Sequence, residues 1–150
     1  MFVYNIRKAK YSNAAIASGI ANRWNKDEEY VLYAGGTISL SALELVAHRS
    51  SINIKMGYKL LHIQTSIQPS DIKTIEVKDL PKNWKSIESY PALQKMGSDW
   101  YCSQQSLLLK VPSVLIPWES NYIINVHHPD FSKKVVLESV EDFTWDNRLI

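Results

Sequence analysis

The tract from Val111 to Phe131 constrains the fold more than any other part of the chain. Its sequence, VPSVLIPWESNYIINVHHPDF, sets three prolines, two histidines and a tryptophan among short apolar runs. It is too polar and too often interrupted by proline for plain core, and too apolar for a solvated loop. Each buried polar group in it needs a partner, because an unpaired one costs about 1–3 kcal/mol. The tract therefore predicts either a rigid corner or the wall of a site.

Size and charge narrow the class of protein. With 150 residues the chain is most simply one domain, long enough to bury a core without a disulfide or a structural metal. Its 17 basic and 15 acidic side chains give a net charge of +2 and are scattered along the sequence. A nucleic-acid binder usually carries a concentrated basic face. We therefore expect no direct contact with DNA or RNA.

The expected compartment follows from apolar runs and cysteine usage. No apolar run approaches the roughly 20 residues that cross a bilayer, and the opening MFVYNIRKAKY lacks the apolar region of a signal peptide. The single cysteine, Cys102, cannot form an internal disulfide, which fits a reducing compartment. We expect it to be a small buried hydrophobe rather than a nucleophile. These observations predict a cytoplasmic protein with no membrane segment.

Strand and helix patterns alternate without a regular rhythm. Apolar and β-branched runs predict strands at Phe2–Arg7, Tyr30–Tyr33, Tyr58–Ile67, Ile72–Val77, Leu107–Lys110, Val114–Ile116 and Lys134–Leu137. An alanine-rich stretch predicts a short helix over 13–20, and Pro91 opens a second helix to Gln104 that Gly97 weakens or divides. Proline at 112 and 117 restricts nearby strands to edges or sharp bends. The sequence predicts the α+β class, as one compact domain with a bent, mostly antiparallel sheet and flanking helices.

The strongest helix signal covers Ser39 to His48. Thr37 or Ser39 can cap its first turn. One apolar face is formed by residues at helical spacing, namely Leu40, Leu43, Val46 and Ala47. His48 and Arg49 fall in the last turn, where positive charge suits the helix dipole. Glu44 lies at the edge of the apolar face.

Short catalytic and metal-binding motifs are absent from the sequence. It contains no phosphate-binding glycine loop, nucleophile elbow or HExxH pair, and Gly35-Gly36 is typical of a turn. Adjacent side chains such as His127 and His128 point in different directions, so they are poor joint ligands. There is no Cys/His cluster for structural zinc. We therefore expect no metal cofactor.

Four dispersed residues remain as candidates, and each also has a purely structural interpretation. Arg23 could stack on the neighbouring Trp24 ring. Tyr33 could be core with a tethered hydroxyl. Glu44 could pair with His48 one turn later, and Ser113 could close a turn after Pro112. From the pattern alone, the structural interpretations are favoured.

The whole chain resembles the RES domain family, toxins of bacterial toxin–antitoxin pairs. The landmarks that carry the resemblance, in order, are VYNI, Arg23-Trp24-Asn25, VLYAGG, SLSALELVAH, PALQKMGSDW, LLLKVPSVLIPWESNYIINVHHPDF and the closing FTWDNRL. One departure stands at Ala21-Asn22, where glycines usually precede the Arg-Trp-Asn motif. A Cβ at both positions restricts positive φ and close backbone approach.

The resemblance implies a fold similar to ADP-ribosyltransferases and NAD as the substrate. Toxins of this family cleave the nicotinamide–ribose bond of NAD, with phosphate or water as acceptor, or transfer ADP-ribose to a protein. Their arginine, tyrosine, glutamate and serine fall on Arg23, Tyr33, Glu44 and Ser113. The partner implied is an Xre-like antitoxin that covers the active site in a hetero-oligomer.

These residue types suit that chemistry. Cleaving an N-glycosidic bond builds oxocarbenium character on the ribose, which the Glu44 carboxylate would stabilise. The guanidinium of Arg23 offers a planar fork to the pyrophosphate, and the Tyr33 ring would stack on nicotinamide. Ser113 would bond the substrate or orient Glu44.

Two further residues and two further functions complete the expectations. Asn121 and His128 are secondary candidates for contacting NAD, although either could only brace its loop. The first alternative function is a protein ADP-ribosyltransferase that uses NAD. The second, motivated by Ala21-Asn22, is a catalytically inactive binding protein.

Overall fold

The structure is a computed structural model that describes residues 1–48 and 52–150. A seven-stranded sheet has the order β4-β5-β6-β2-β1-β3-β7, in which only β4 and β5 are parallel neighbours. The strands are β1 (Phe2–Lys8), β2 (Val31–Gly35), β3 (Tyr58–Thr65), β4 (Ile72–Thr74), β5 (Leu108–Pro112), β6 (Ser120–Asn125) and β7 (Val135–Phe143). The helices are α1 (Ile38–Ala47), α2 (Tyr90–Ser103) and α3 (Phe131–Lys134), and short 3-10 turns connect several elements. The α+β class and the mostly antiparallel sheet are confirmed.

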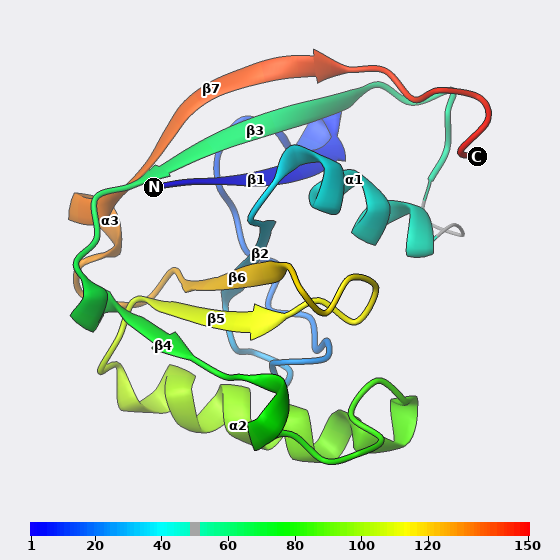
Figure 1. Cartoon of the computed structure of the whole chain (residues 1–150). Coiled ribbons are helices and arrows are strands. Elements are labelled where there is room, and N and C mark those ends of the chain that lie inside the picture. The colour runs from blue at the N-terminus through cyan, green and yellow to red at the C-terminus, as the bar shows by residue number, and fades with distance from the viewer. Residues whose placement is uncertain (49–51) are drawn as a thin grey trace.

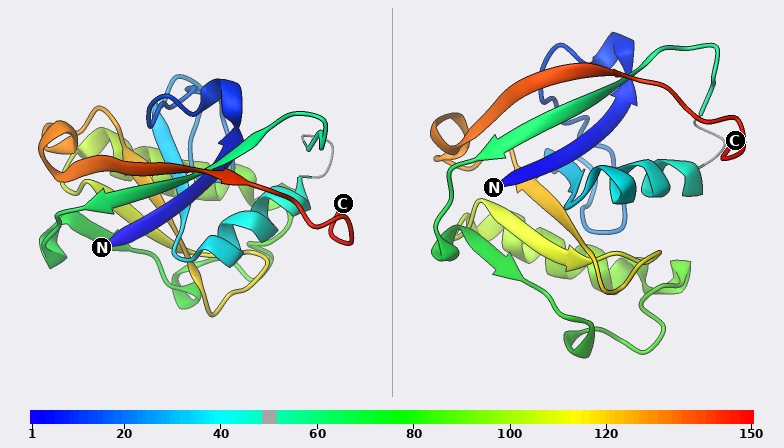
Figure 2. Two further views of the ribbon diagram at one scale, coloured as in Figure 1. Left: turned by 90° about the horizontal axis from the view of Figure 1, so that it is seen from above. Right: turned by 45° about the horizontal axis from the view of Figure 1, so that its top comes forward.

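The sheet bends because β1 and β2 barely pair. They share one register pair, Tyr4 with Gly35, whereas β1 and β3 pair along seven residues. The sheet therefore divides into a β1-β3-β7 half and a β2-β6-β5-β4 half, which lie one above the other in Figure 1. Helix α1 occupies the opening between the halves, and both views in Figure 2 keep it beside β1.

Two buried clusters sit on opposite faces of the β2-β6-β5-β4 half. The first lies between the two halves and includes Val3, Leu61, Leu108 and Ile124. The second lies between this half and α2, below it in Figure 1, and includes Trp24, Leu93, Trp100, Leu109 and Ile123. A strand buried on both faces reads as a continuous apolar run. This explains the unbroken LLL that leads into β5.

At the end of the molecule opposite α1, side chains hold the two halves together. The Lys134 ammonium, just before β7, lies 2.9 Å from an Asp71 carboxylate oxygen, just before β4. The pKa of Asp71 is held below its ordinary value first by a hydrogen bond from the Gln68 backbone N–H, then by the bond and the charge of Lys134, and least by the charge of His128. The sheet is thus closed at one end and open at the other.

Two predicted elements were wrong, and one strand was missed. The stretch 13–20 is not helical, because it has no apolar face to bury: Ile16 and Ile20 are exposed. The Arg7 guanidinium also donates hydrogen bonds to the backbone carbonyls of Ala14 and Ile16, which a helix would need for its own bonds. The strand predicted at Val114–Ile116 is a loop, since the Ser113 hydroxyl accepts the backbone N–H groups of both Leu115 and Ile116. Strand β6, which had not been predicted, follows that loop.

The two long helices form where expected, with differences in packing. Thr37 caps α1, its hydroxyl accepting from the Leu40 N–H at 3.0 Å. Leu43 is exposed, whereas Leu45 is partly buried, because the side of α1 that packs against β1 carries Leu45 and not Leu43. Gly97 does not divide α2. Arg49 lies outside the described residues.

Two smaller findings concern the expected compartment. Cys102 is exposed, which corrects its prediction as a buried hydrophobe. It lies in the last turn of α2, on the face turned away from Leu93 and Trp100. Within residues 1–48 and 52–150, no helix has both the length and the apolar character needed to traverse a bilayer.

Candidate active site

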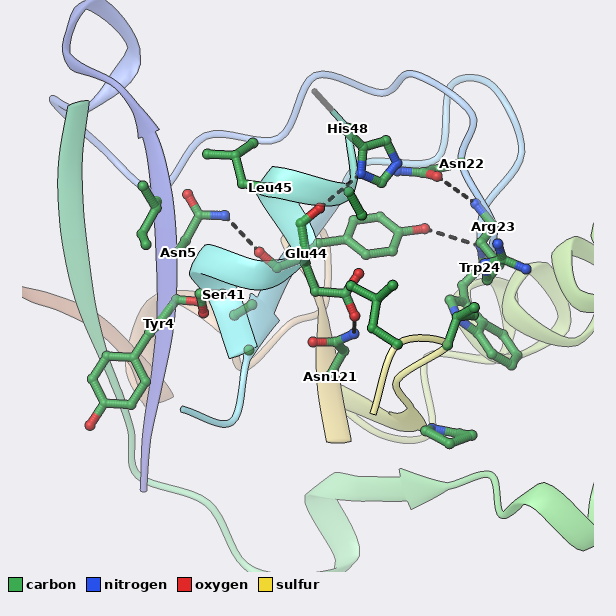
Figure 3. A pocket seen from close by; sticks show the side chains of 18 of the residues that line it. Tyr4, Asn5, Asn22, Arg23, Trp24, Ser41, Glu44, Leu45, His48 and Asn121 are labelled. Atoms are coloured by element: carbon green, nitrogen blue, oxygen red, sulfur yellow. Dashed lines mark hydrogen bonds between the residues drawn. The ribbon is translucent and has the colours of Figure 1, made fainter. Parts of the chain in front are cut away.

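A pocket of about 380 Å³ opens where the two halves of the sheet part. Ligand pockets commonly have volumes of about 300–1,000 Å³. Its walls come from β1, the turn at 22–24, β2, α1, Tyr90 at the start of α2, and the segment that joins β5 to β6. Figure 3 shows Glu44 and Asn121 in the middle, with Arg23 and Trp24 on one side and Tyr4 and Asn5 on the other. Residues far apart in sequence thus meet because the β1–β2 junction is open.

Arg23 has only neutral partners. One guanidinium nitrogen donates to the carbonyls of Trp84 and Lys85, at 3.2 and 3.3 Å. The guanidinium carbon lies 4.6 Å from the centre of the Tyr90 ring, a cation–π contact. Within the described residues no carboxylate pairs with it. Its charge is oriented but not neutralised, as a site for an anionic ligand requires.

Tyr33 holds the turn that carries Arg23. Its hydroxyl donates to Asn25 Oδ1 at 2.6 Å and accepts the Trp24 N–H at 3.1 Å. Asn25 is itself buried, and its amide donates to the carbonyls of Ile20 and Lys26. Burial, above all, raises the pKa of Tyr33 well above its ordinary value. The hydroxyl therefore stays protonated near neutral pH and positions the turn, while the ring remains in the pocket wall.

Removing that hydroxyl is expected to loosen the turn. In Tyr33→Phe the buried Asn25 carbonyl and the Trp24 N–H lose their partner, at a cost of about 1–3 kcal/mol in unfolding free energy. Urea denaturation measures this. Tyr122→Phe is the matched control, because within the described residues the Tyr122 hydroxyl makes no hydrogen bond. Equal stability of the two variants would contradict the role assigned to the Tyr33 hydroxyl.

Gly97 lets α2 approach the same turn. A Cβ at this position would overlap the Trp24 carbonyl oxygen. Next to it, the Ser98 hydroxyl donates to the buried Glu29 carboxylate at 2.6 Å, and the other oxygen of Glu29 accepts the Lys26 N–H. The sequence therefore uses a glycine in the middle of a helix for close packing, not for a break.

Glu44 is oriented through one of its two oxygens. Oε1 accepts from the Ser113 hydroxyl at 2.8 Å and from the Asn121 amide at 2.6 Å. In the described part of the chain Oε2 has no hydrogen-bond partner, which leaves it for a ligand. Contrary to the helical-pair interpretation, His48 contacts the backbone carbonyl of Glu44, at 2.9 Å, and not its carboxylate.

Ser113 lies behind Glu44 rather than in the pocket wall. It is fully buried, and its hydroxyl both donates to Glu44 and accepts the N–H groups of Leu115 and Ile116. All its hydrogen-bonding capacity is used within the protein. Of the two roles expected for it, this geometry favours orienting Glu44. Asn121, expected to contact a ligand, also points at Glu44.

His128 is not brought to this site. It follows β6 at the far end, where its Nε2 lies 2.9 Å from the Gln104 carbonyl and its Nδ1 accepts the Asp130 N–H. Both ring nitrogens brace the turn before α3. The position fits the structural interpretation of this residue and gives no support to a contact with NAD in the pocket.

The departure at Ala21-Asn22 is accommodated without strain. Among the described residues only Glu28 and Gln104 have positive φ outside glycine, so neither position needs a glycine conformation. The Asn22 side chain accepts the Arg23 N–H at 2.8 Å, and its carbonyl accepts from Gln94. Asn22 thereby becomes part of the pocket wall.

Sequence reasoning missed Tyr90 and Asn5. Tyr90 reaches Arg23 from the start of α2. The Asn5 amide donates to the Tyr33 carbonyl at 2.8 Å and so bridges the β1–β2 junction, while Arg7 donates to its oxygen. Asn5 lies within the VYNI landmark and Tyr90 directly before PALQKMGSDW, but each acts through a long-range contact that these motifs do not reveal. In the region that the structure describes, no group of three His, Cys, Asp or Glu side chains could hold a metal ion.

Comparisons with known proteins agree on one family. The model of the RES domain matches residues 2–146. Toxin Res of Yersinia enterocolitica is 32% identical over 135 residues, covering 89% of this chain and 86% of that protein. Toxin Res of Photorhabdus laumondii is 28% identical over 154 residues, covering 100% and 97%. The Prs ADP-ribosylating toxin of a Sphingobium species is 32% identical over 131 residues, covering 85% and 80%.

A solved structure has the same fold. It is the crystal structure of the M. tuberculosis MbcT–MbcA toxin–antitoxin complex, with a TM-score of 0.73 at 14% identity over 95% of this chain and 84% of that one. The family model spans nearly the whole chain, and relatives above 30% identity cover most of it. The protein therefore belongs to the RES domain family.

Proposed function

We propose that this protein is the toxin of a toxin–antitoxin pair and consumes NAD by cleaving the bond between nicotinamide and ribose. The observation that carries the proposal is a single pocket lined by an unneutralised guanidinium, Arg23, and an oriented carboxylate, Glu44. A relative named Toxin Res supports the toxin role, and a relative named for ADP-ribosylation supports the use of NAD.

The charges of Arg23 and Glu44 suit two neighbouring parts of NAD, the pyrophosphate and the ribose carbon that bears nicotinamide. A pyrophosphate is anionic, and Arg23 offers it a fixed planar fork. The glycosidic bond breaks with its electron pair going to the nicotinamide nitrogen, which leaves as a neutral molecule and needs no strong acid. The ribose carbon becomes electron-poor, and the free oxygen of Glu44 stabilises that developing charge.

The acceptor completes the reaction at the same carbon. Water forms a new C–O bond and releases a proton, giving ADP-ribose, while phosphate would give ADP-ribose phosphate. In our assignment Arg23 binds substrate and Glu44 meets the reacting carbon. Tyr33 and Tyr90 hold the arginine turn and line the nicotinamide side of the pocket, and Ser113 and Asn121 position Glu44.

A protein acceptor is the second candidate. The relative named Prs ADP-ribosylating toxin, 32% identical, favours it. The two functions share bond cleavage and differ in where ADP-ribose ends. With NAD labelled in the adenosine half and a cell lysate, transfer leaves label on protein, whereas hydrolysis or phosphorolysis leaves it on small molecules.

The test of the main proposal is nicotinamide release from purified protein and NAD, with and without inorganic phosphate. Release in the parent but not in Glu44→Gln is the expected result. Faster release with phosphate identifies phosphorolysis. If the folded parent releases no nicotinamide under any of these conditions, the main proposal fails. Label on protein in the lysate experiment would then identify the transferase, and no label there would leave the catalytically inactive binding protein.

A partner follows from the activity. A cell that makes an NAD-consuming enzyme must keep it blocked, so we propose an Xre-like antitoxin that covers the pocket in a hetero-oligomer in the cytoplasm. The solved structure of similar fold comes from a toxin–antitoxin complex, which supports this pairing. Neither proposal calls for a metal or for direct binding of nucleic acid.

A further inference from the structure

Trp118 is the most exposed large apolar side chain of the described residues, at 92%. It belongs to the segment 113–119 that joins β5 to β6, here called the Trp118 loop. In Figure 1 this loop extends beyond the ends of both strands, on the same side as the open end of the sheet. A tryptophan left in water forgoes a large burial gain, and exposed tryptophans at binding surfaces often dominate affinity.

The Trp118 loop is held by hydrogen bonds at both ends. The Ser113 N–H donates to the Glu119 carbonyl at 3.0 Å, and the Glu119 N–H donates to the Ile116 carbonyl at 2.8 Å. The Glu119 carboxylate accepts from Thr37 at 3.1 Å, which ties the loop to the start of α1. A partner that binds a loop fixed in this way loses little conformational entropy. The geometry therefore suits an anchor better than a mobile surface.

The loop also forms one wall of the pocket. Val114 and Leu115 line the cavity, and Leu115 is 38% exposed, so the apolar surface continues from the cavity onto the loop. A molecule packed on Trp118 and Leu115 would lie at the pocket mouth. It would be close enough to reach the groups inside with a short extension.

Charge at the opposite wall indicates what that extension carries. Arg23 has only neutral partners, and the exposed Lys82 and Lys85 on the neighbouring segment form no ion pair within the described residues. Arg23 in the pocket wall, with two exposed lysines on the segment whose carbonyls it bonds, is complementary to a protein segment that combines apolar and acidic side chains. These cations are a poor match to a second copy of this chain, whose Trp118 loop contributes one acid, Glu119, already bonded to Thr37.

We propose that the Trp118 loop is the anchor for the antitoxin, which covers Trp118 and Leu115 with apolar side chains and places an acidic group against Arg23. The identity of the partner rests on the proposed function. The surface that the partner binds, and the apolar and acidic side chains that it must carry, are new.

The test measures, by titration calorimetry, the affinity of the purified toxin for its candidate antitoxin, a small helical protein encoded by the adjacent reading frame; if no such protein binds the parent toxin, the proposal fails. Trp118→Ala is expected to raise Kd at least about 30-fold, the effect of losing a hot-spot tryptophan. Arg23→Gln is expected to raise it about tenfold by loss of a charge-assisted contact. Tyr11→Ala, which removes another exposed aromatic side chain, should leave Kd unchanged. Nicotinamide release by Trp118→Ala without antitoxin should equal that of the parent.

Other outcomes overturn the proposal. An unchanged Kd for Trp118→Ala rules out the anchor, and an unchanged Kd for Arg23→Gln rules out the acidic group. If Trp118→Ala keeps its antitoxin affinity but loses self-association, the loop binds a second copy of the chain. If it keeps that affinity but loses protein labelling, the loop binds an acceptor protein. Trp118→Phe, which keeps an aromatic ring, should retain most of the affinity and guards against a folding defect. Binding is measured without NAD, so the affinities can be interpreted even if the protein does not cleave NAD.

Discussion

Replacing Glu44 by glutamine is expected to slow nicotinamide release about 10²–10³-fold, the usual cost of removing one preorganised electrostatic contact. The amide oxygen of glutamine can still accept from Ser113 and Asn121, so the hydrogen bonds that orient the side chain survive. What disappears is the negative charge beside the electron-poor ribose carbon. Single-turnover release of nicotinamide at saturating NAD measures the change in the chemical step.

Glu138→Gln provides the matched control, because it neutralises an exposed carboxylate on β7 at the outer edge of the sheet. It should release nicotinamide at the parental rate. Both variants should melt within a few degrees of the parent, so a lost rate cannot be a lost fold. A Glu44→Gln variant that is folded and fully active would remove Glu44 from the reaction.

Replacing Gly97 by alanine is expected to reduce both stability and activity. The new Cβ would overlap the Trp24 carbonyl, so α2 and the Arg23 turn must move apart. Overpacking of this kind costs about 1–3 kcal/mol in unfolding free energy. The Arg23 guanidinium moves with the turn, and a displacement of about 1 Å at a substrate-positioning group can cost about 10²-fold in rate.

A second glycine supplies the comparison for this variant. In Gly57→Ala the new Cβ meets, among the described residues, only the Cβ of Ala9, at an ordinary contact distance of 3.6 Å. Urea denaturation and nicotinamide release should both match the parent. If Gly97→Ala proves as stable and active as Gly57→Ala, the close approach of α2 to the Arg23 turn does not matter for function.

The elements that the sequence predicted well are those determined by local signals. The Thr37 cap and the helical spacing of apolar residues locate α1, and Pro91 locates the start of α2. The family resemblance, not the pattern, selected Arg23, Tyr33, Glu44 and Ser113. Three of these line the pocket and Ser113 lies directly behind it.

Predictions failed where a distant side chain decides the outcome. The stretch 13–20 has helix-forming residues, but Arg7 on β1 takes its carbonyls. Strand character at Val114–Ile116 is overridden because the Ser113 hydroxyl occupies the N–H groups of that segment. His128 belongs to the same polar tract as Asn121, yet β6 carries the two to opposite ends. The composition of the tract cannot show which of the two residues reaches the pocket, since it contains no information on the direction of the strand.

The single register pair between β1 and β2 has a consequence for how the protein would respond to the proposed substrate. Near the pocket, side chains replace the missing ladder: Asn5 reaches Tyr33, and Ser41 reaches the Tyr4 carbonyl. A dinucleotide bound there would touch both halves of the sheet and add contacts along the seam. At a concentration 100 times Kd, such a ligand raises the unfolding free energy by about 2.7 kcal/mol. Amide hydrogens of β1 and β2 should then exchange more slowly, because NAD would serve as a cross-brace between the halves.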